Sequence, residues 1–347
     1  MKLTKKKTRG KSETRGKSKT RGKSETGSKS KTKGKSSSKK ENSKILTLDA
    51  FNKLEYPYRH LAISKSQMKS DFAELRKYRG KFITYNPGKM KIAKFRNRNY
   101  LLFVESYSDQ NHLHQITNYF SHKCRVVCIF NLKESENILT LFTKNKKKIL
   151  KELKARKEEL TFKNINEYLY RHHRECTNFN TTMVMNILNL FKPKRWLDCS
   201  AGWGDRLTGF LASPIVEHIT LIDPRAGSIN KCKEQHVFVN STKTLKTIQM
   251  PAEEALEGVP SNSIDLIVTS PPYFNLECYG ENEFEAQGQI RNKVKDAEEY
   301  RNVFLRPVIE NCARILKPGG TMVLNLDDNK RVGVDICGPA LEILNSL

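Results

Sequence analysis

The sequence predicts an α/β protein built on a doubly wound parallel sheet. Three observations lead to this prediction. From residue 175 onward, short apolar strands alternate with helical patterns. A turn with two glycines, Gly202 and Gly204, follows the first of these strands, and a Ser-Pro-Pro-Tyr segment, Ser270 to Tyr273, follows the fourth. Alternating strand and helix units form parallel sheets whose ligands bind at the carboxyl ends of the strands.

Charge divides the 347 residues into three parts. Residues 1–44 hold 18 basic and 3 acidic residues, residues 45–194 hold 29 and 13, and residues 195–347 hold 16 and 21. The formal net charge of +26 indicates an anionic partner, either nucleic acid or an acidic surface. Combined with the change of pattern near residue 175, the charges predict a tail at 1–44, a basic domain at 45–174 and the sheet domain at 175–347.

The tail repeats Thr-Arg-Gly-Lys-Ser with a period of six residues. It has almost nothing apolar to bury, so we expect it to be disordered. Its Gly-Lys-Ser triplets do not form a phosphate-binding loop, because the distance from Gly10 to Gly16 is one residue too long and no strand precedes it. Two interpretations stay open: a polycation that gathers nucleic acid, or a solubilising or nuclear-import segment.

The basic region is predicted to be an α+β domain that binds nucleic acid. Basic and aromatic residues interleave over residues 89–100, where they can contact phosphates and stack on bases. Beta-branched and aromatic runs predict strands, and apolar residues at helical spacing predict helices. The predicted strands are 82–85, 100–104 and 126–130, and the predicted helices are 149–160 and 164–172.

Cysteine and histidine usage predicts no metal site. The eight cysteines include no C-x-x-C pair, which is typical of a reduced, intracellular protein, cytoplasmic or nuclear. No signal peptide or membrane-spanning run is present in the sequence. One group of potential zinc ligands matches no zinc pattern in its spacing: His112, His114, His122, Cys124 and Cys128.

In the third part, five strands and three long helices alternate. Helices are expected from Asp205, from Pro224, and from Phe304 to a Lys-Pro-Gly-Gly stop at residues 317–320. The predicted strands are Arg195 to Cys199, His218 to Ile222, Thr247 to Met250, Ile264 to Thr269 and Thr321 to Leu326.

Two groups of residues are candidates for binding a ligand. Glycines at 202 and 204 allow a tight turn that approaches a ligand, and Asp223, at the end of the second strand, can accept hydrogen bonds from ribose hydroxyls. The alternative is a plain glycine turn with a helix-capping Asp223. At Pro271 and Pro272 two backbone donors are missing, so we expect the carbonyls there to face outward and accept hydrogen bonds from an amino group.

These motifs resemble those of the DNA amino-methyltransferases, which make N6-methyladenine or N4-methylcytosine. Asp198-x-x-Ala201-Gly202-x-Gly204 is similar to the family's cofactor motif, and Ser270-Pro271-Pro272-Tyr273 to its catalytic motif. The serine form is more typical of cytosine-N4 enzymes. With its basic extension, the chain also resembles methylases assigned to large DNA viruses and phages, which implies a viral factory or host cell as its location.

The resemblance implies a Rossmann-like S-adenosylmethionine methyltransferase fold, that cofactor, and DNA as partner. Asp198, Ala201, Gly202 and Gly204 would hold the methionine part, Asp223 the ribose, and Glu253 would lie near the adenine ring. Asn178 and Phe179 would correspond to an upstream cofactor motif. The implied catalytic residues are Ser270, Pro271, Pro272 and Tyr273, with Tyr273 and Phe274 stacking on a base that has left the helix.

The mechanism expected from this resemblance is alignment of the amino nitrogen of the base with the methyl group of the cofactor. Two acceptors, the Ser270 side chain and the Pro271 carbonyl, would hold the amino hydrogens so that the nitrogen faces the methyl group. Carbon-5 cytosine chemistry is disfavoured, because those enzymes use a cysteine after proline and the chain has no Pro-Cys pair.

Two features depart from the family. Only 65 residues separate Gly204 from Ser270, which leaves no room for a recognition domain there. The chain continues for about 20 residues after the fifth expected strand, so the sheet is expected to lack the usual last two strands and a C-terminal recognition domain. DNA recognition would then fall to the basic region before Arg174.

Three alternatives stand beside a DNA enzyme. An RNA base N-methyltransferase would use the same chemistry on the amino group. A protein-glutamine methyltransferase is disfavoured, because those enzymes carry asparagine where this chain has Ser270. The third is a noncatalytic nucleic-acid-binding protein with a degenerate or truncated methyltransferase domain, which cofactor binding would distinguish.

Overall fold

The computed structural model describes residues 45–79, 94–95, 98–99, 111–130, 136–173, 175–274, 276–279, 288–328 and 333–347. Residues 42–347 belong to one compact unit. The expected disordered tail, the expected strands 82–85 and 100–104, and most of the basic and aromatic run 89–100 lie outside the described residues. Within that run the structure has a short antiparallel pair, β1 (Lys94–Phe95) and β2 (Arg98–Asn99).

The elements before the main sheet are mostly helical. They are α1 (Leu48–Lys53), the 3₁₀ turns Arg59–Leu61 and Asn111–His114, α2 (Lys65–Lys77), α3 (Gln115–Val126), α4 (Ile138–Ala155), α5 (Phe162–His172) and α6 (Thr181–Phe191).

The sheet region alternates strands and helices as predicted. Its elements are β3 (Arg195–Asp198), α7 (Asp205–Ala212), β4 (His218–Ile222), α8 (Ala226–Phe238), β5 (Thr244–Ile248), α9 (Ala252–Ala255), the turn Leu256–Gly258, β6 (Ile264–Thr269), α11 (Ile290–Lys293), α12 (Ala297–Tyr300), the π-helical turn Arg301–Leu305, α13 (Arg306–Ile315), β7 (Leu316–Leu324) and α14 (Cys337–Ser346).

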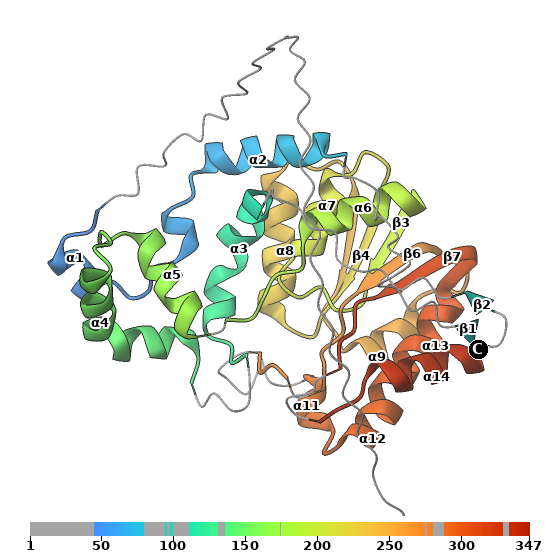
Figure 1. Ribbon diagram of the computed structural model, residues 1–347. Coiled ribbons are helices and arrows are strands. Elements are labelled where there is room, and N and C mark those ends of the chain that lie inside the picture. The colour runs from blue at the N-terminus through green and yellow to red at the C-terminus, as the bar shows by residue number, and fades with distance from the viewer. Residues whose placement is uncertain are drawn as a thin grey trace, which may run out of the picture. The chain divides into compact units, whose positions relative to one another are not determined.

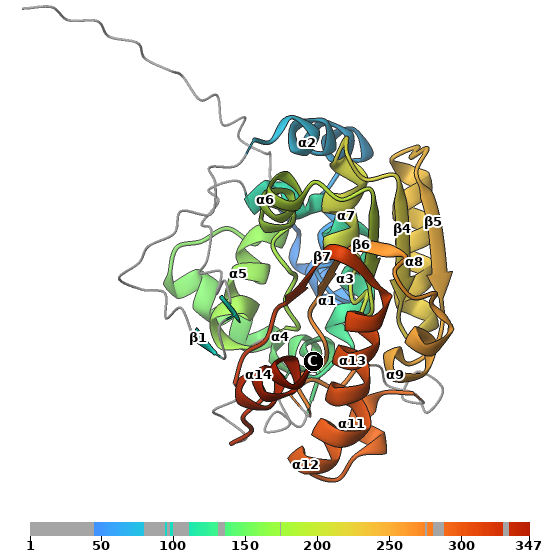
Figure 2. The same cartoon turned by 90° about the vertical axis from the view of Figure 1, so that its right-hand side faces the viewer.

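All five strands are parallel, in the order β5-β4-β3-β6-β7. Figure 2 shows β4 and β5 at one side of β6 and β7. The strands β3 and β6 are hydrogen-bonded neighbours, with Trp196 beside Leu266 and Leu197 beside Ile267. The order reverses at β3, so the loops after β3 and β6 meet at the switch point where such sheets bind ligands. The predicted doubly wound α/β fold is confirmed.

Helices bury both faces of the sheet, because side chains alternate along each strand. On one face Trp196, Leu266 and Val268 pack with residues of α6, α7 and α8. On the other face Leu197 and Ile267 pack with residues of α9, α13 and α14. The sheet therefore lies between two apolar layers that hold its loops in place.

The helices α1, α4 and α5 share a third apolar core. Figure 1 shows them as a group, with α3 between this group and α8. Phe51, Tyr56, Phe142 and Tyr168 are fully buried in that core or nearly so. Short polar side chains begin five of the helices before the sheet by accepting a backbone hydrogen bond: Thr47, Ser64, Asn137, Thr161 and Asn180. The predicted helices 149–160 and 164–172 correspond to the second half of α4 and to α5.

The predicted strand 126–130 is wrong. Val126 ends α3, and Ile129 forms only an isolated bridge with Cys278. The buried face of α3 includes the polar residues Ser121, His122 and Arg125. The hydrophobic period is interrupted in this helix, because its buried face mixes these polar residues with the apolar Ile116 and Val126.

Other boundaries differ by a few residues. The strands β4 and β6 have the predicted bounds, whereas β5 begins at Thr244 rather than Thr247. The strand β7 begins at Leu316 and includes the Lys-Pro-Gly-Gly stop, where the pairing shifts from Ile264–Leu316 to Leu266–Thr321. Proline fits there because β7 is at the edge of the described sheet. Within the described chain, no helix has the length and apolar character needed to cross a membrane.

Candidate functional site

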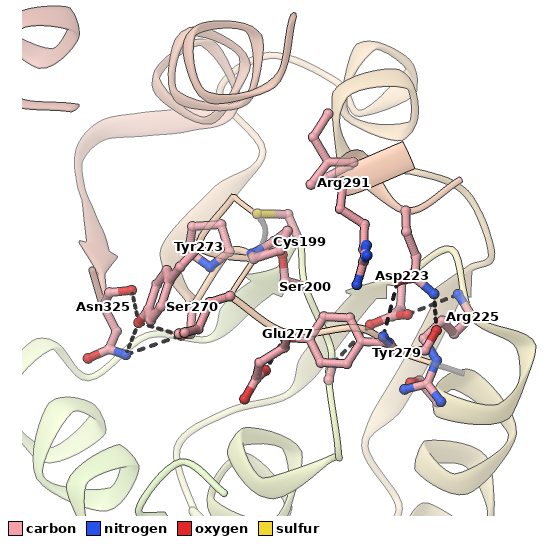
Figure 3. A pocket seen from close by; sticks show the side chains of 18 of the residues that line it. Cys199, Ser200, Asp223, Arg225, Ser270, Tyr273, Glu277, Tyr279, Arg291 and Asn325 are labelled. Carbon is pink, nitrogen blue, oxygen red and sulfur yellow. Dashed lines mark hydrogen bonds between the residues drawn. The ribbon is translucent and has the colours of Figure 1, made fainter. Parts of the chain in front are cut away.

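A cavity of about 940 Å³ opens at the carboxyl ends of the strands. Its lining includes the loops after β3, β4, β5 and β6, the segment before α6, and α11. Figure 3 shows Ser270 and Tyr273 on one side of the cavity and Asp223 on the other. Such a volume is in the range of small-molecule and cofactor sites. The two predicted motifs therefore share one cavity.

The loop after β3 bends through its two glycines. Gly202 and Gly204 have φ angles of 57° and 79°, in the left-handed region that favours glycine. Gly202 lines the cavity, whereas Ala201 and Gly204 do not. A Cβ on Gly204 would lie 2.4 Å from Nε2 of Gln235. Gly204 is thus required for packing α7 on α8, and Gly202 for presenting the loop to the cavity.

Asp223 lies opposite this loop, where the sequence places it. Its Oδ2 accepts a hydrogen bond from the Gly202 N–H at 2.9 Å, and its Oδ1 accepts one from the Arg225 N–H at 2.9 Å. Burial raises the pKa of Asp223, although Arg225 opposes the shift. Each oxygen keeps a lone pair for a further donor.

Asp198 has a different environment from the one expected. It does not line the cavity; its carboxylate is buried and accepts hydrogen bonds from Arg206 Nε at 2.6 Å and the Ser200 N–H at 3.1 Å. Burial raises the pKa of Asp198, although Arg206 opposes the shift. The carboxylate therefore holds the glycine loop in shape, and Arg206 lies at the cavity wall in its place.

The upstream pair Asn178 and Phe179, expected from the resemblance to belong to a cofactor motif, lines the cavity. The Phe179 N–H donates to Oδ2 of Asp205 at 2.7 Å, and the Arg206 guanidinium lies 5.5 Å from the Phe179 ring centre. Asn178 Nδ2 donates to Asn118, and its Oδ1 is buried with no partner in the described part of the chain. Sequence reasoning missed Asp205 and Arg206, although an Asp-Arg pair opening an apolar helix was a visible signal.

Glu253 lies in the first turn of α9 and lines the cavity near the end of β5. Its carboxylate pairs with Lys293 Nζ at 2.9 Å, and the same ammonium contacts Glu254 at 2.8 Å. Lys293 ends α11, so this ion pair joins α9 to α11 along one side of the cavity.

Ser270, Tyr273 and Asn325 form a hydrogen-bonded group (Figure 3). Ser270 Oγ lies 3.0 Å from the Tyr273 hydroxyl, which donates to the Asn325 carbonyl at 2.8 Å. Asn325 Nδ2 donates to Ser270 Oγ at 3.1 Å and to Tyr273 Oη at 2.7 Å. Burial raises the pKa of Tyr273. The motif sequence did not indicate Asn325, because this residue follows β7 and only the β6–β7 pairing brings it close.

The two proline carbonyls differ, which corrects the expectation that both face outward. The Pro272 carbonyl accepts hydrogen bonds from the Tyr300 hydroxyl at 2.7 Å and the Phe274 N–H at 3.1 Å. For the Pro271 carbonyl, the structure has no donor among the described residues. The Pro271 carbonyl, which is the one expected to contact the amino group, can therefore accept a hydrogen bond from a ligand.

Phe274 is more buried than a stacking residue needs to be. Its side chain is 8% exposed, and its ring lies edge-on to that of Tyr300 at 5.7 Å. Its φ of 54° is left-handed, which is unusual for a residue with a bulky side chain. The ring lines the cavity wall and anchors the loop to the core of the π-turn and α13.

The helical region also reaches the cavity. Ile129 and Cys278 exchange backbone hydrogen bonds of 3.0 and 2.8 Å, and Phe130 lines the cavity. Glu277, beside this bridge, accepts a hydrogen bond from the Tyr279 hydroxyl, and burial raises its pKa. Among the described side chains, no three His, Cys, Asp or Glu residues gather as a metal site requires.

Comparison with known proteins finds a family match in the part of the chain that holds the Ser-Pro-Pro-Tyr segment. Residues 264–345 match the DNA methylase family of N6 and N4 methyltransferases. The type II methyltransferase M.SmaI of Serratia marcescens is 33% identical over 95 residues, 27% of this chain and 30% of that protein. M.BslI, a type II beta methyltransferase of Bacillus sp. (strain NEB-606), is 34% identical over 91 residues, 26% of this chain and 9% of that protein.

A third relative is the type II methyltransferase M.BglII of Bacillus subtilis, 37% identical over 67 residues, 19% of this chain and 15% of that protein. The matched segments span less than a third of each of these relatives. The family match includes β6, the Ser-Pro-Pro-Tyr loop and β7, but not the glycine loop or Asp223. In the segment that carries the catalytic motif, the chain is thus similar to the DNA amino-methyltransferases.

Proposed function

We propose that this chain transfers a methyl group from S-adenosyl-L-methionine to an exocyclic amino group of a DNA base, N4 of cytosine or N6 of adenine. One observation supports this most strongly. Pro271 and Ser270, at the end of β6, line the same cavity as Asp223 and the glycine loop. Acceptors for an amino group and groups suited to a nucleoside cofactor therefore face the same cavity.

The family implies S-adenosyl-L-methionine, and the polar atoms of the cavity fit it. The Asp223 carboxylate suits ribose hydroxyls. The buried Asn178 Oδ1, which lacks a partner in the described chain, suits an ammonium group. Bound there, the cofactor supplies a methyl group on a positively charged sulfur. Gly202 and Arg206 would complete the wall beside its amino-acid end, with Asp198 acting through Arg206.

The hydrogen bonds within the group leave Ser270 with one acceptor site. Because Tyr273 donates to the Asn325 carbonyl, Ser270 can donate to Tyr273 Oη and accept from Asn325 Nδ2. A hydroxyl oxygen has two lone pairs, so one remains for an amino hydrogen of the base. The Pro271 carbonyl takes the other hydrogen, and the nitrogen lone pair is directed out of the base plane.

Tyr273 is proposed to stack on the target base, with its ring orientation held by Ser270 and Asn325. Phe274, locked against Tyr300, is proposed to shape the floor of the base site rather than to move with the base. The base must leave the double helix to reach this depth.

DNA is the proposed partner for two reasons: the family match with its relatives, and the excess of basic residues before the sheet. The matched family is described as a DNA methylase family, and the three relatives are type II methyltransferases. The basic residues of 45–194 outnumber the acidic ones by 16, and α4 carries six lysines: 144, 146, 147, 148, 151 and 154. Such a surface binds phosphates without reading sequence.

The test is transfer of labelled methyl from the cofactor to double-stranded DNA, single-stranded DNA and RNA, followed by nucleoside analysis. Ser270→Ala and Tyr273→Ala should each lower kcat by about 10- to 100-fold or more, because each removes a contact made to the reacting base. The matched controls are Ser66→Ala and Tyr170→Ala, which alter exposed side chains outside the cavity.

The proposal is supported if the label appears in N4-methylcytosine or N6-methyladenine of DNA and is reduced in both site variants but in neither control. The labelled nucleoside then identifies the base. Label in RNA alone would assign the chain as an RNA base N-methyltransferase. No label on any substrate, together with no cofactor binding by calorimetry, would contradict the proposal and favour the alternative of a noncatalytic nucleic-acid-binding protein.

A further inference from the structure

Arg291 lies in the cavity and has no role in the chemistry described above. It is the second residue of α11, and Figure 3 shows its side chain extending from α11 toward the centre of the cavity, on the side of Asp223. Its Nη1 is buried and has no hydrogen-bond partner in the described part of the chain. A buried donor without a partner destabilises a protein, so a donor of this kind that lines a cavity is suited to an acceptor on a ligand.

The position of α11 shows which part of a ligand Arg291 would meet. Gly288, just before the helix, packs so closely that a Cβ there would lie 3.1 Å from Pro224 Cβ and 3.3 Å from Pro251 Cγ. Pro224 follows β4 and Pro251 follows β5. Lys293, at the end of α11, pairs with Glu253 and Glu254. The helix therefore covers the β4 and β5 side of the cavity.

The Ser-Pro-Pro-Tyr motif, proposed to hold the base that accepts the methyl group, lies farther along the sheet. Ser270 follows β6, and the order β5-β4-β3-β6 puts β3 between β4 and β6. Two strand spacings, roughly 10 Å, separate the ends of β4 and β6. Arg291 thus lies on the side where Asp223 would hold the ribose, and so the nucleoside half of the cofactor would lie beneath it.

A second polar atom supports this placement. Ser228, in the first turn of α8, is 3% exposed, lines the cavity, and its Oγ has no partner among the described residues. Two buried donors, Ser228 Oγ and Arg291 Nη1, thus line the cavity together with Asp223. Adenosine carries several nitrogen and oxygen acceptors, which suit two donors.

We propose that Arg291 binds the adenosine half of the cofactor by donating a hydrogen bond through Nη1. This inference rests on the proposed function, because it takes S-adenosylmethionine as the cofactor. The planar guanidinium can donate in the plane of an acceptor while its apolar stem packs on the ring, which a lysine cannot reproduce. Arg291 is therefore a cofactor-binding residue in addition to those expected from the motifs.

The test is calorimetric binding to the full chain with two probes. S-adenosylhomocysteine has the nucleoside and the amino-acid end, whereas 5′-methylthioadenosine has the nucleoside alone. Arg291→Met keeps the apolar stem and removes all donors. It should raise the Kd of both probes by about 10- to 100-fold, the effect of losing one hydrogen bond to a charged donor. Arg291→Lys should recover only part of that affinity.

Arg301→Met is the matched control, because Arg301 makes an ion pair with Glu342 and does not line the cavity. It should leave both Kd values unchanged. If Arg291→Met lowers the melting temperature of the free protein, Arg291→Gln is used in its place. This variant keeps an amide donor, so the Kd of both probes should rise by a smaller factor.

Three results would overturn the inference. A loss for S-adenosylhomocysteine alone would place Arg291 at the amino-acid carboxylate. Unchanged binding of both probes would remove Arg291 from the cofactor site while leaving the proposed function intact. Failure of the unaltered chain to bind S-adenosylhomocysteine would instead overturn the proposed function, and this inference with it.

Discussion

At the scale of single residues, Glu175 joins the helical region to the sheet region. Its carboxylate contacts Arg59 at 2.9 Å, His122 at 3.0 Å and Arg125 at 3.4 Å. His122 Nδ1 accepts a hydrogen bond from the Arg59 N–H at 2.9 Å, so the neutral ring must carry its proton on Nε2 and donate it to Glu175. Protonation of Nδ1 would break the Arg59 bond.

This network predicts loss of stability in acid. Burial lowers the pKa of His122 to about 4, against the attraction of Glu175. Burial alone would raise the pKa of Glu175, but Arg125, His122 and Arg59 hold it well below its usual range. Below pH ~6.5 the unfolded His122 binds a proton that the folded one does not, so unfolding becomes easier by about 3 kcal/mol as the pH falls to ~4. Glu175 adds a loss below its unfolded pKa of ~4.5.

Urea unfolding between pH 7 and 4.5 measures this effect. His122→Gln keeps an amide that can donate to Glu175 but does not titrate, so its free energy of unfolding should depend less on pH over that interval. An equal pH dependence in both proteins would show that His122 does not carry the effect.

Asn325 provides a prediction about catalysis. Its side-chain amide binds both Ser270 and Tyr273, and the side chain is exposed, so Asn325→Ala should change stability little. We expect kcat for methyl transfer to fall about tenfold, because the variant removes one hydrogen bond of about 1 kcal/mol to each of these two side chains, which are proposed to position the base. The Kd for S-adenosylhomocysteine should not change.

Asn311→Ala is the control for this measurement, because, among the described residues, the Asn311 amide bonds to Pro307 and Arg314 within α13 and to neither residue of the candidate site. A fall in cofactor affinity that matches the fall in kcat would mean that Asn325 supports the cofactor side of the cavity instead.

At the scale of elements, the turn between β3 and α7 depends on two glycines for different reasons. Gly202→Ala meets only ordinary contacts, at 3.6 Å or more, so it should cost about 1–2 kcal/mol for the left-handed backbone alone. Gly204→Ala has the same backbone strain and also a clash with Gln235, for about 1–3 kcal/mol more.

The free energy of unfolding in urea separates the two effects. In a Gln235→Ala background, Gly204→Ala should cost no more than Gly202→Ala does, because the clash has gone. If the Gly204 variant keeps its full cost in that background, the packing of α7 on α8 is not the reason for the glycine.

At the scale of the whole molecule, the excess of basic residues and most residues of the candidate site lie in different parts of the chain. The basic excess lies before residue 195, whereas residues 195–347 carry a net charge of −5. Deletion of residues 1–44, which carry +15, should weaken binding to random-sequence DNA and flatten its salt dependence. The slope of log K against log salt should fall by about 0.9 for every phosphate that the tail neutralises in the unaltered chain.

Fluorescence anisotropy at several salt concentrations checks this prediction. The control is a full-length chain with the tail's Lys and Arg changed to Gln, which keeps the length and removes the charge. Both variants should behave alike, and kcat at saturating DNA should stay that of the unaltered chain. An unchanged salt slope would show that the tail does not contact DNA.

Much of the fold and part of the site followed from local sequence. The strands β4 and β6 were predicted with their observed bounds, because short apolar runs bounded by turn residues are a local signal. The convergence of the glycine loop, Asp223 and the Ser-Pro-Pro-Tyr segment also followed, since parallel strands bring their carboxyl ends to one edge.

The remaining features depend on residues far apart in the chain. Asp198 binds Arg206 instead of facing the cavity, Tyr300 donates a hydrogen bond to the Pro272 carbonyl, and Asn325, after the next strand, binds Ser270 and Tyr273. The helix α3 buries His122 and Arg125, which bind Glu175, 50 positions or more away in the chain. A local pattern states which residues prefer burial, whereas hydrogen-bond partners for buried polar groups are settled only when the whole chain has packed.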